Sequence, residues 1–427
     1  MNPVVSPRTQ QAQVSVRPNH QNCRICGKML PPPFLDLGAM PLANAFLASP
    51  QEFDNEARYP LAVCACTACE LVQLNHVVPA DQLYRNYIYV SSTSEAVRAH
   101  ADTLADQLIR RYDWQASSLI VEVASNDGTV LKAFQSRGVR VLGVEPAKNI
   151  AALAQADGIP TVAEFFNEAT ARDLLAQYGQ ASGIIARHVF AHVDDVHGFL
   201  EGARHVLRPD GVLIIEAPYF GDLLQQREFD TIYHEHLSYL AFRPMQRLCD
   251  LHGLRIIHVD RIGLHGGSAI FHIVRSEQKV ARSASLEEFL LQEERDQITS
   301  PERLGLFVRE VQAWKSQFTE LLQSIDRSGG VLAGYGAAAK ANTLLNYCPE
   351  AAQLLRCLFD RSPHKQGRYT PGTHLRVEPV DRWQAQGVTH LVLLAWNFTD
   401  EIMRQMQPFA HSGGRFVQVL PRPGILS

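Results

Sequence analysis

The chain has 427 residues, 46% hydrophobic and 20% charged, with 40 basic against 44 acidic side chains. This length exceeds what one hydrophobic core supports, so two or three domains are expected. The near balance of charge excludes the basic surface that binds nucleic acid or anionic membranes, so we expect small-molecule partners and leave monomer and dimer open. No apolar signal core opens the chain and no run approaches the ~20 apolar residues of a membrane helix, so a cytoplasmic protein is expected.

Residues 1–20 are polar and lack periodicity, so we expect a disordered tail. Two Cys-x-x-Cys pairs follow, and four thiolates on two tight turns are the usual ligands of a structural zinc ion. The stretch between the pairs is too small to bury its own core, so the ion would contribute folding energy. Cys64 is an alternative ligand with poorer spacing, and four unrelated free cysteines are the structural alternative. The expected ligands are Cys23, Cys26, Cys66 and Cys69.

Aromatic and hydroxyl side chains gather between residues 78 and 95. Tyr84, Tyr87 and Tyr89 precede the hydroxyl-rich stretch from Ser91 to Ser94. This composition suits either a domain junction or a lid over a ligand, and the sequence leaves both open. Helical spacing then begins at Glu95.

Residues 119–128 are organised as a strand, a small-residue turn and the start of a helix. A second apolar run ends at Glu145, and an acidic residue at that place in a βαβ unit typically binds two ribose hydroxyls. The turn Ala-Ser-Asn-Asp-Gly has one glycine, unlike the GxGxxG of a dinucleotide site. We therefore favour S-adenosylmethionine, which has no phosphates, over an ordinary strand-turn-helix without a ligand.

The α/β alternation continues to Glu216 and predicts a parallel sheet whose ligands lie at the carboxyl ends of its strands. Phe165 and Phe166 follow a short strand where an adenine ring could stack. A further strand carries Ala186 and His188 to the same edge, and His192 follows it. The residues expected around the cofactor are Glu122, Ala124, Asn126, Asp127, Gly128, Glu145, Phe165, Phe166 and His188.

The segment 229–237 concentrates titratable side chains. On a helix, Tyr233 and His236 would share a face and could address one bound atom. His236 could take a proton from a carbon acid, Tyr233 could donate to the developing enolate oxygen, and Glu235 could hold a tautomer. A metal pair of His234 and His236 is disfavoured because residues two apart point to different sides of a helix, and a structural cluster remains the alternative. Residues 255–274 predict an antiparallel hairpin around His265-Gly266-Gly267-Ser268.

Residues 286–327 predict a helical connector, and a second nucleotide-type unit follows it. Its strand, glycine loop and helix span residues 331–341, and the next strand ends at Asp360. Glycines at such a turn permit close backbone approach, and the helix N-terminus with Lys340 favours an anion. A diphosphate or nucleotide site is expected, with a structural duplicate lacking a ligand as the alternative. Its candidate residues are Gly334, Gly336, Lys340, Asn342, Asp360, Lys365, Arg368 and His265.

With these motifs in this order, the chain from about residue 23 resembles the NDP-hexose C-methyltransferases of deoxysugar pathways. The matching stretches are CRICG, CTACELVQL, YIYVSS, VEVASNDG, FDTIYHEH, HGGS, GYGAAAKANTLLN, KQGRYTPGTH and LAWNF. The resemblance implies an α/β protein whose class I SAM-methyltransferase domain is a Rossmann-like parallel sheet. We expect a zinc-binding domain at 21–90, the S-adenosylmethionine-dependent domain at 91–283, and a helical connector with a C-terminal Rossmann-like sugar-nucleotide domain at 284–427.

The resemblance also implies the chemistry. A base removes the proton α to the ketone of an NDP-keto-deoxysugar, expected to be TDP-linked, and the enolate attacks the methyl group of the sulfonium cofactor. The base falls on His236, with Tyr233 and Glu235 as support. His192 and one of Tyr87 or Tyr89 would complete the site.

The sequence departs from the family at one place, because relatives usually have glycine where Ala124 stands. A positive φ there would make alanine weaken cofactor binding, whereas β-like dihedrals would accept it at no cost, and we expect the second.

Two other functions compete with sugar methylation: methyl transfer to a non-sugar acceptor, and a non-catalytic scaffold that binds zinc and nucleosides. The glycine-lysine loop argues against the first, and the Tyr-x-Glu-His cluster against the second.

Overall fold

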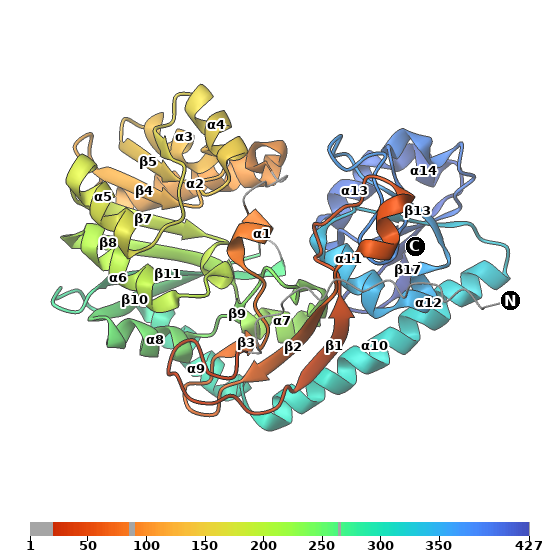
Figure 1. Cartoon of the computed structure of the whole chain (residues 1–427), viewed down its shortest axis with the longest axis horizontal. Helices are drawn as coiled ribbons and strands as arrows, with labels where there is room; N and C mark the ends of the chain where they lie inside the picture. The colour runs from red at the N-terminus through yellow and green to blue at the C-terminus, as the bar shows by residue number, and fades with distance from the viewer. Residues whose placement is uncertain (1–19, 85–89, 264–265, 427) are drawn as a thin grey trace, which may run out of the picture.

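The computed structural model describes residues 20–84, 90–263 and 266–426. Figure 1 shows an N-terminal part (20–84), a central part (90–283) and a C-terminal part (284–426), each built on its own sheet. Helix α10 (Pro301–Arg327) runs along one edge of the molecule from the N-terminal sheet to the C-terminal part. In the described ranges, no helix is both long and apolar enough to cross a bilayer.

The N-terminal sheet is completed by a strand from the central part. Its order is β1-β2-β3-β9, and all of its pairings are antiparallel. The strands are β1 (Leu35–Met40), β2 (Tyr59–Ala65), β3 (Val72–Leu74) and β9 (Ser238–Tyr239). The short helices nearby are η1 (Pro50–Asn55), α1 (Ala80–Tyr84) and η2 (Ser91–Thr93). The buried Arg24 guanidinium donates to the carbonyls of Leu74 (3.0 Å) and Leu237 (3.1 Å), which fastens the N-terminal part beside β9.

The central sheet has seven strands in the order β10-β11-β8-β7-β4-β5-β6. Strands β4 to β8 are parallel, whereas β11 pairs antiparallel with both β8 and β10. The strands are β4 (Leu119–Val123), β5 (Arg140–Val144), β6 (Thr161–Val162), β7 (Ala181–Arg187), β8 (Leu207–Pro218), β10 (Leu254–Ile262) and β11 (Ser268–Arg275). The order changes direction at β4, where a parallel sheet opens a crevice at its carboxyl edge. The predicted strand-turn-helix, the parallel sheet and the hairpin are confirmed.

Helices cover both faces of this sheet. They are α2 (Glu95–Tyr112), α3 (Thr129–Gln135), α4 (Lys148–Ala156), α5 (Glu168–Tyr178), η3 (Phe190–His192), α6 (Val196–Val206), α7 (Phe220–Gln226), η4 (Phe229–Thr231) and α8 (Phe242–Leu251). Ser94 caps α2 by accepting a hydrogen bond from the Val97 N–H, and so the helix begins where the hydroxyl-rich stretch ends.

The C-terminal sheet repeats the parallel plan in the order β14-β13-β12-β15-β16-β17, with only β17 antiparallel among the described strands. Its strands are β12 (Leu332–Tyr335), β13 (Leu355–Phe359), β14 (Val377–Glu378), β15 (His390–Leu393), β16 (Arg415–Gln418) and β17 (Gly424–Leu426). Its helices are α11 (Ala339–Tyr347), α12 (Pro349–Ala352), η6 (Val380–Trp383), η7 (Trp396–Phe398), α13 (Thr399–Gln405) and α14 (Gln407–His411). The second strand-loop-helix unit is therefore present.

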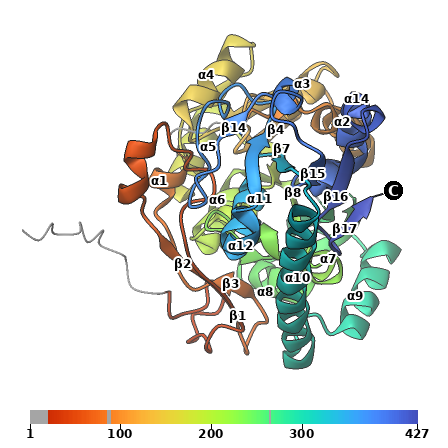
Figure 2. The ribbon, with the colours of Figure 1, turned by 90° about the vertical axis from the view of Figure 1, so that its right-hand side faces the viewer.

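The connector consists of two helices, α9 (Ala284–Asp296) and α10. One stripe of α10 at helical spacing is buried: Leu304, Phe307, Val311, Trp314, Phe318, Leu322 and Ile325. The Trp314 indole N–H also donates to the Val419 carbonyl at 2.7 Å. Figure 2 shows α10 crossing in front of the C-terminal part beside α12, and its buried stripe makes it part of the core.

Candidate functional site

Three residues of the loop after β4 have left-handed backbone. The φ angles are 52° at Ala124, 52° at Asn126 and 75° at Gly128. A Cβ at Gly128 would lie 2.9 Å from Cγ1 of Ile159, so only glycine fits there. The expectation of β-like dihedrals at Ala124 is wrong, and alanine in this conformation costs about 1–2 kcal/mol relative to ordinary backbone.

The Glu145 carboxylate holds this loop in place. Its Oε2 accepts the Asn126 N–H at 2.9 Å, and its Oε1 accepts the Ala147 N–H at 2.8 Å. Burial raises the pKa of Glu145, while these two backbone donors lower it. Each carboxylate oxygen can accept a second hydrogen bond, so the group retains acceptor capacity for hydroxyls such as those of a ribose.

The polar side chains of the loop bind the hydroxyl-rich turn η2. Oδ1 of Asn126 accepts the Ser91 N–H at 2.9 Å, and Oδ2 of Asp127 accepts the Ser92 N–H at 3.1 Å. The turn from Ser91 to Thr93 therefore borders the loop after β4. Tyr87 and Tyr89, which precede it, lie outside the described residues.

A buried charge cluster lies at the ends of β7 and β8. Glu216 is fully buried and accepts hydrogen bonds from His188 Nε2 (3.0 Å), Arg187 Nε (2.9 Å) and His100 Nε2 (2.9 Å). Burial favours the neutral carboxyl, but these partners outweigh it and hold the pKa of Glu216 well below its usual value. The predicted meeting of His188 and Glu216 is confirmed.

Three residues predicted to lie around the cofactor, Glu122, Phe165 and Phe166, have different environments. Burial raises the pKa of Glu122 to about 8, and its Oε2 makes no hydrogen bond within the described chain. Phe166 packs edge-on against Phe199 with ring centroids 5.2 Å apart, so it belongs to the core beneath α6. Phe165 is half-buried in the loop after β6.

Tyr233 and His236 contact each other from a turn. The His236 N–H donates to the Tyr233 carbonyl at 2.9 Å, and Tyr233 Oη lies 2.8 Å from His236 Nε2. His236 Nδ1 lies 2.7 Å from the Thr231 carbonyl, which can only accept, so Nδ1 carries the proton. Nε2 therefore accepts from the Tyr233 hydroxyl. The predicted helix is wrong, although the pairing it implied is present.

Burial is the main influence on His236. Burial first, and then the neighbouring His192, hold the pKa of His236 well below its usual value, so the imidazole is neutral near pH 7. The His192 ring is nearly perpendicular to it, with centroids 4.9 Å apart. Burial lowers the pKa of His192 to about 4. Tyr84 Oη lies 2.9 Å from His192 Nδ1 and 3.3 Å from the Glu235 carbonyl, and so α1 closes over the pair.

Glu235 faces the N-terminal part. Its Oε1 accepts from Asn44 Nδ2 at 2.6 Å, and burial raises its pKa to about 7. The hypothesis that Glu235 holds the His236 tautomer is wrong, because the Thr231 carbonyl does so. His234 points elsewhere and contacts the Tyr59 carbonyl through Nε2 at 3.2 Å.

Lys340, at the start of α11, reaches the central part. Its Nζ lies 4.4 Å from the ring centroid of Trp396, whose indole N–H donates to Asp230 Oδ2 at 2.7 Å. Burial raises the pKa of Asp230 to about 6, and the Lys340 charge opposes that rise. The same charge lowers the pKa of His236, after the effects of burial and His192. The Lys340 charge therefore lowers the pKa of two residues of this segment, Asp230 and His236.

Asp360 anchors the loop after β12 by accepting backbone hydrogen bonds, as Glu145 anchors the loop after β4. Its Oδ2 accepts the Ala337 N–H and its Oδ1 accepts the Ser362 N–H, each at 2.8 Å. Lys365 Nζ donates to the Ala337 carbonyl at 2.9 Å. Gly336 has φ 94°, and a Cβ there would lie 2.6 Å from that of Ala395.

The remaining candidate residues of the predicted nucleotide site do not lie together. Asn342 is buried and donates to the Ala43 carbonyl at 2.7 Å. This hydrogen bond joins α11 to the N-terminal part. Gly334 is required by packing, because a Cβ would lie 2.4 Å from Leu358 Cδ2. Arg368 is exposed, and His265 lies outside the described residues.

A cleft of about 550 Å³ lies between the central and C-terminal parts. Among its lining residues are Asp222, Arg261, Gly266, Gly267, Trp396 and Asn397. Arg261 pairs with Asp222, and a Cβ at Gly267 would lie 2.4 Å from Oδ2 of the same carboxylate. The turn at Gly266 and Gly267 therefore borders this cleft.

The four predicted zinc ligands converge. Their Sγ atoms all lie within 4.8 Å of one another, with Cys23 to Cys69 at 3.3 Å and Cys26 to Cys66 at 3.5 Å. A tetrahedral ion with Zn–S bonds of ~2.3 Å needs thiolates ~3.8 Å apart, which these positions nearly provide. Cys64 lies on β2 outside the cluster, and burial raises its pKa to about 11. The four cysteines predicted as ligands therefore form one cluster that fits a zinc ion.

Comparison with known proteins finds the same three parts in the same order along the chain. Family models match in chain order: a zinc binding domain at 23–84, a methyltransferase domain at 97–259 and a C-methyltransferase C-terminal domain at 263–421. The C-methyltransferase NovU of Streptomyces niveus is 34% identical over 414 residues, covering 96% of this chain and 98% of NovU. The chain belongs to this C-methyltransferase family. It is an S-adenosylmethionine-dependent C-methyltransferase with a class I fold and an N-terminal zinc-binding domain.

Solved structures similar to this C-methyltransferase include two other methyltransferases. Magnesium protoporphyrin IX methyltransferase from Synechocystis PCC 6803, with bound S-adenosylmethionine, is 13% identical, with 42% of this chain and 79% of that chain covered and a TM-score of 0.32. The CcbJ methyltransferase of Streptomyces caelestis is 13% identical, with 41% and 89% covered and a TM-score of 0.34.

Several residues near His236 and the cleft were not predicted as site residues. Tyr84 stood out only as one of three tyrosines, and Asn44 lies in a loop without any motif. Asp230 lies in the stretch FDTIYHEH and Trp396 in the stretch LAWNF, yet their contact joins segments far apart in the sequence. Arg261 carries no local signal beyond its place next to the predicted glycine turn.

Proposed function

We propose that the protein methylates the carbon next to the ketone of a nucleotide-linked keto-deoxysugar, with a TDP-linked sugar as the first candidate. The observation that carries the proposal is the state of His236. Its imidazole is buried and neutral, and the Thr231 carbonyl fixes the Nδ1–H tautomer. The imidazole is neutral with its lone pair on Nε2, so it can act as a base toward a carbon acid once the Tyr233 hydroxyl turns from Nε2 to the ketone oxygen of the substrate.

In the proposed reaction, Nε2 of His236 accepts the proton from the carbon α to the ketone. The pair of electrons left on that carbon gives an enolate, and the Tyr233 hydroxyl donates a hydrogen bond to the enolate oxygen. The positive charge of Lys340 favours this anion electrostatically. Bound S-adenosylmethionine would supply an electrophilic methyl group to the same carbon, and the electrons of the broken C–S bond would leave with S-adenosylhomocysteine. Burial of His236 and Glu235 keeps water from the enolate.

The second Rossmann-like unit supports a nucleotide handle on the substrate. Its loop after β12 ends at the N-terminus of α11, where backbone N–H groups favour phosphate oxygens. The cleft beside Trp396 and Arg261 joins this unit to the central part. An acceptor without a nucleotide would leave that unit without a ligand to bind.

The test is incubation with S-adenosylmethionine and a set of TDP-4-keto-6-deoxy sugars in deuterated water. We expect deuterium at the carbon α to the ketone without the cofactor, and a carbon-bound methyl group with it. Free keto-deoxysugars without the nucleotide are the matched controls and should react poorly. Absence of both exchange and methylation with every nucleotide sugar, or equal turnover of the free sugars, would contradict the proposal.

A further inference from the structure

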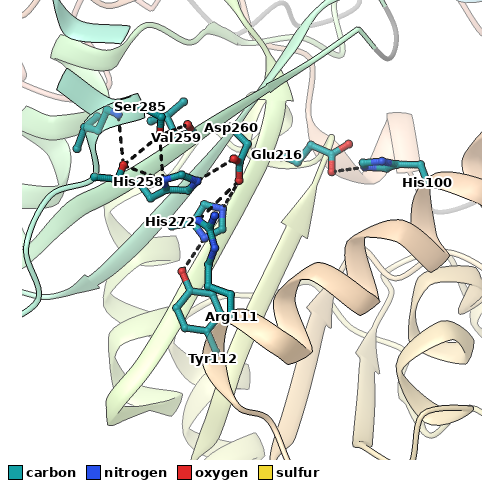
Figure 3. A network of polar contacts seen from close by, with 11 residues as sticks. His100, Arg111, Tyr112, Glu216, His258, Val259, Asp260, His272 and Ser285 are labelled. Carbon is teal, nitrogen blue, oxygen red and sulfur yellow. Dashed lines mark hydrogen bonds and ion pairs between the residues drawn. The ribbon is translucent and has the colours of Figure 1, made fainter. Parts of the chain in front are cut away.

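A second cluster of metal-ligating side chains lies on the β10–β11 hairpin (Figure 3). His258 and Asp260 are two residues apart on β10, and His272 is the cross-strand partner of His258, so the pleat places all three on one face. His258 Nε2 lies 2.7 Å from Asp260 Oδ1, and His272 Nε2 lies 3.0 Å from Asp260 Oδ2. One ligand atom from each residue lies within 4.8 Å of the others.

The outer ring nitrogens of both histidines are held by hydroxyl groups. Tyr112 Oη lies 2.6 Å from His272 Nδ1. The hydroxyl oxygens of Ser283 and Ser285 lie 2.7 and 3.0 Å from His258 Nδ1. Histidines that bind metal ions nearly always have their second nitrogen fixed by such a partner.

The serine hydroxyls favour a proton on Nδ1 of His258. Ser285 Oγ donates its one proton to the Val259 carbonyl at 3.1 Å. Ser283 Oγ accepts the Leu286 N–H at the start of α9 and lies 3.0 Å from Ser285 Oγ, to which it can donate. With Ser283 donating to Ser285, both serine oxygens offer lone pairs to His258, and this arrangement favours a proton on Nδ1.

This tautomer leaves the Nε2 lone pair of His258 aimed at the Asp260 carboxylate. In that tautomer a lone pair and an anionic oxygen face each other at 2.7 Å, and either a second imidazole proton or a metal ion between them relieves the repulsion. Arg111 Nη1 lies 3.9 Å from Asp260 Oδ2, but both side chains are 41% exposed, so that ion pair is weak.

We propose that His258, Asp260 and His272 bind a divalent transition-metal ion of the zinc, cobalt or nickel class, separate from the ion of the four cysteines. Two imidazoles and one carboxylate form a ligand set that such ions accept, with water in the remaining positions. The Asp260 side chain is 41% exposed and the His272 side chain 2%, so the ion enters beside the carboxylate and rests against the buried imidazole.

The ion would fasten three elements together. Tyr112 is the last residue of α2, Ser283 caps α9, and the cluster itself lies on the hairpin. Strand β10 continues from Asp260 to Arg261, which lines the cleft. Bound metal would therefore stabilise the fold and stiffen one wall of that cleft.

The test is titration of the full-length, zinc-containing protein with Co²⁺. We expect one cobalt equivalent to bind at micromolar concentration, with weak d–d absorption, no thiolate-to-metal charge transfer and a rise in Tm. His258→Gln and Asp260→Asn should lose this equivalent and the rise in Tm while retaining the cysteine-bound zinc. His205→Gln, at an exposed position on α6, is the matched control and should keep both.

Three results would overturn the proposal. They are no added equivalent in the unaltered protein, uptake only at millimolar cobalt and equally in His258→Gln, or imidazole NMR signals showing Nε2–H on both histidines in the presence of cobalt. None of these results depends on the sugar substrate, so they leave the proposed function untouched.

Discussion

His236 shows how a single residue acquires its chemical state from the backbone around it. The Thr231 carbonyl fixes its tautomer and Tyr233 occupies its free nitrogen. Replacing the imidazole by an amide of similar hydrogen-bonding pattern removes the base and leaves the turn intact.

We expect His236→Asn to slow deuterium exchange at the substrate carbon by about 10²–10⁴-fold, the usual contribution of a general base. The affinity for S-adenosylmethionine, measured by calorimetry, should stay unchanged because the loop after β4 is not altered. His252→Asn, at a buried histidine paired with His197, is the control for loss of a buried imidazole. Retained exchange would move the basic role to Tyr233 or His192.

The pH dependence of exchange follows from the depressed pKa of His236. Above that pKa the imidazole is neutral and active, and the rate falls as pH drops through it, so the acid limb should lie well below pH 6.5. Lys340→Met removes a positive charge that lowers this pKa, so the acid limb should move to higher pH. Lys132→Met, whose ammonium pairs with Asp157 on the surface, should leave the profile in place. An unchanged profile in Lys340→Met would show that the Lys340 charge does not act on the His236 imidazole.

Ala124 is strained at φ 52°, a conformation that glycine adopts freely. Ala124→Gly should therefore raise Tm and tighten S-adenosylmethionine binding, with up to about 1 kcal/mol of relief after the flexibility that glycine adds to the unfolded chain. Ala152→Gly, at an exposed position inside α4, is the opposite control and should cost about 1 kcal/mol. Weaker binding in Ala124→Gly would show that the alanine methyl group contacts the cofactor.

At the scale of elements, the short N-terminal strands depend on other parts of the protein. Strand β3 has only three residues and is paired on its far side by β9 from the central part. Three short strands around two cysteine turns bury little apolar surface by themselves. The zinc ion and β9 therefore supply what the segment lacks.

Cys66→Ser should release the zinc and expose the N-terminal part to limited proteolysis, because a closed tetrahedral shell loses one of its thiolates. Cys64→Ser is the matched control two residues away, and it should retain the metal since Cys64 lies outside the cluster. Metal analysis and the position of the proteolytic cuts measure the two effects. Zinc retained in Cys66→Ser, or lost in Cys64→Ser, would mean a different ligand set.

At the scale of the whole molecule, all three parts meet around the turn that carries His236. Asn44 of the N-terminal part binds Glu235, and Trp396 of the C-terminal part binds Asp230. Helix α11 packs on η4, the short helix that ends at Thr231. The position of the C-terminal part is thereby linked to the carbonyl that fixes the base.

Trp396→Phe tests this link, because it keeps an aromatic ring under Lys340 and removes the indole N–H that Asp230 accepts. A hydrogen bond to a charged group is worth about 1.5–3 kcal/mol, so kcat should fall at least about tenfold. The affinity for S-adenosylmethionine should be unchanged. Trp383→Phe, at a half-buried position packed against the apolar core of the C-terminal part, is the control. Normal kcat in Trp396→Phe would show that the hydrogen bond between Trp396 and Asp230 does not contribute to catalysis.

Local patterns in the sequence determined the elements and the metal ligands. Apolar runs predicted β4, β5 and β7, paired cysteines predicted the zinc site, and the repeated strand-loop-helix signal predicted the second Rossmann-like unit. Each of these depends on residues within a few positions of one another, so periodicity and spacing suffice.

Only the tertiary structure decided the backbone and the partners of the site. The loop after β4 is held by Glu145, which follows the next strand and binds the Asn126 N–H, and Ala124 in the same loop lies in the left-handed region against expectation. The turn at Tyr233 replaced a predicted helix because its neighbours bind it from both other parts of the chain. Contacts between residues far apart in sequence decide such dihedrals and tautomers, and no local pattern records them.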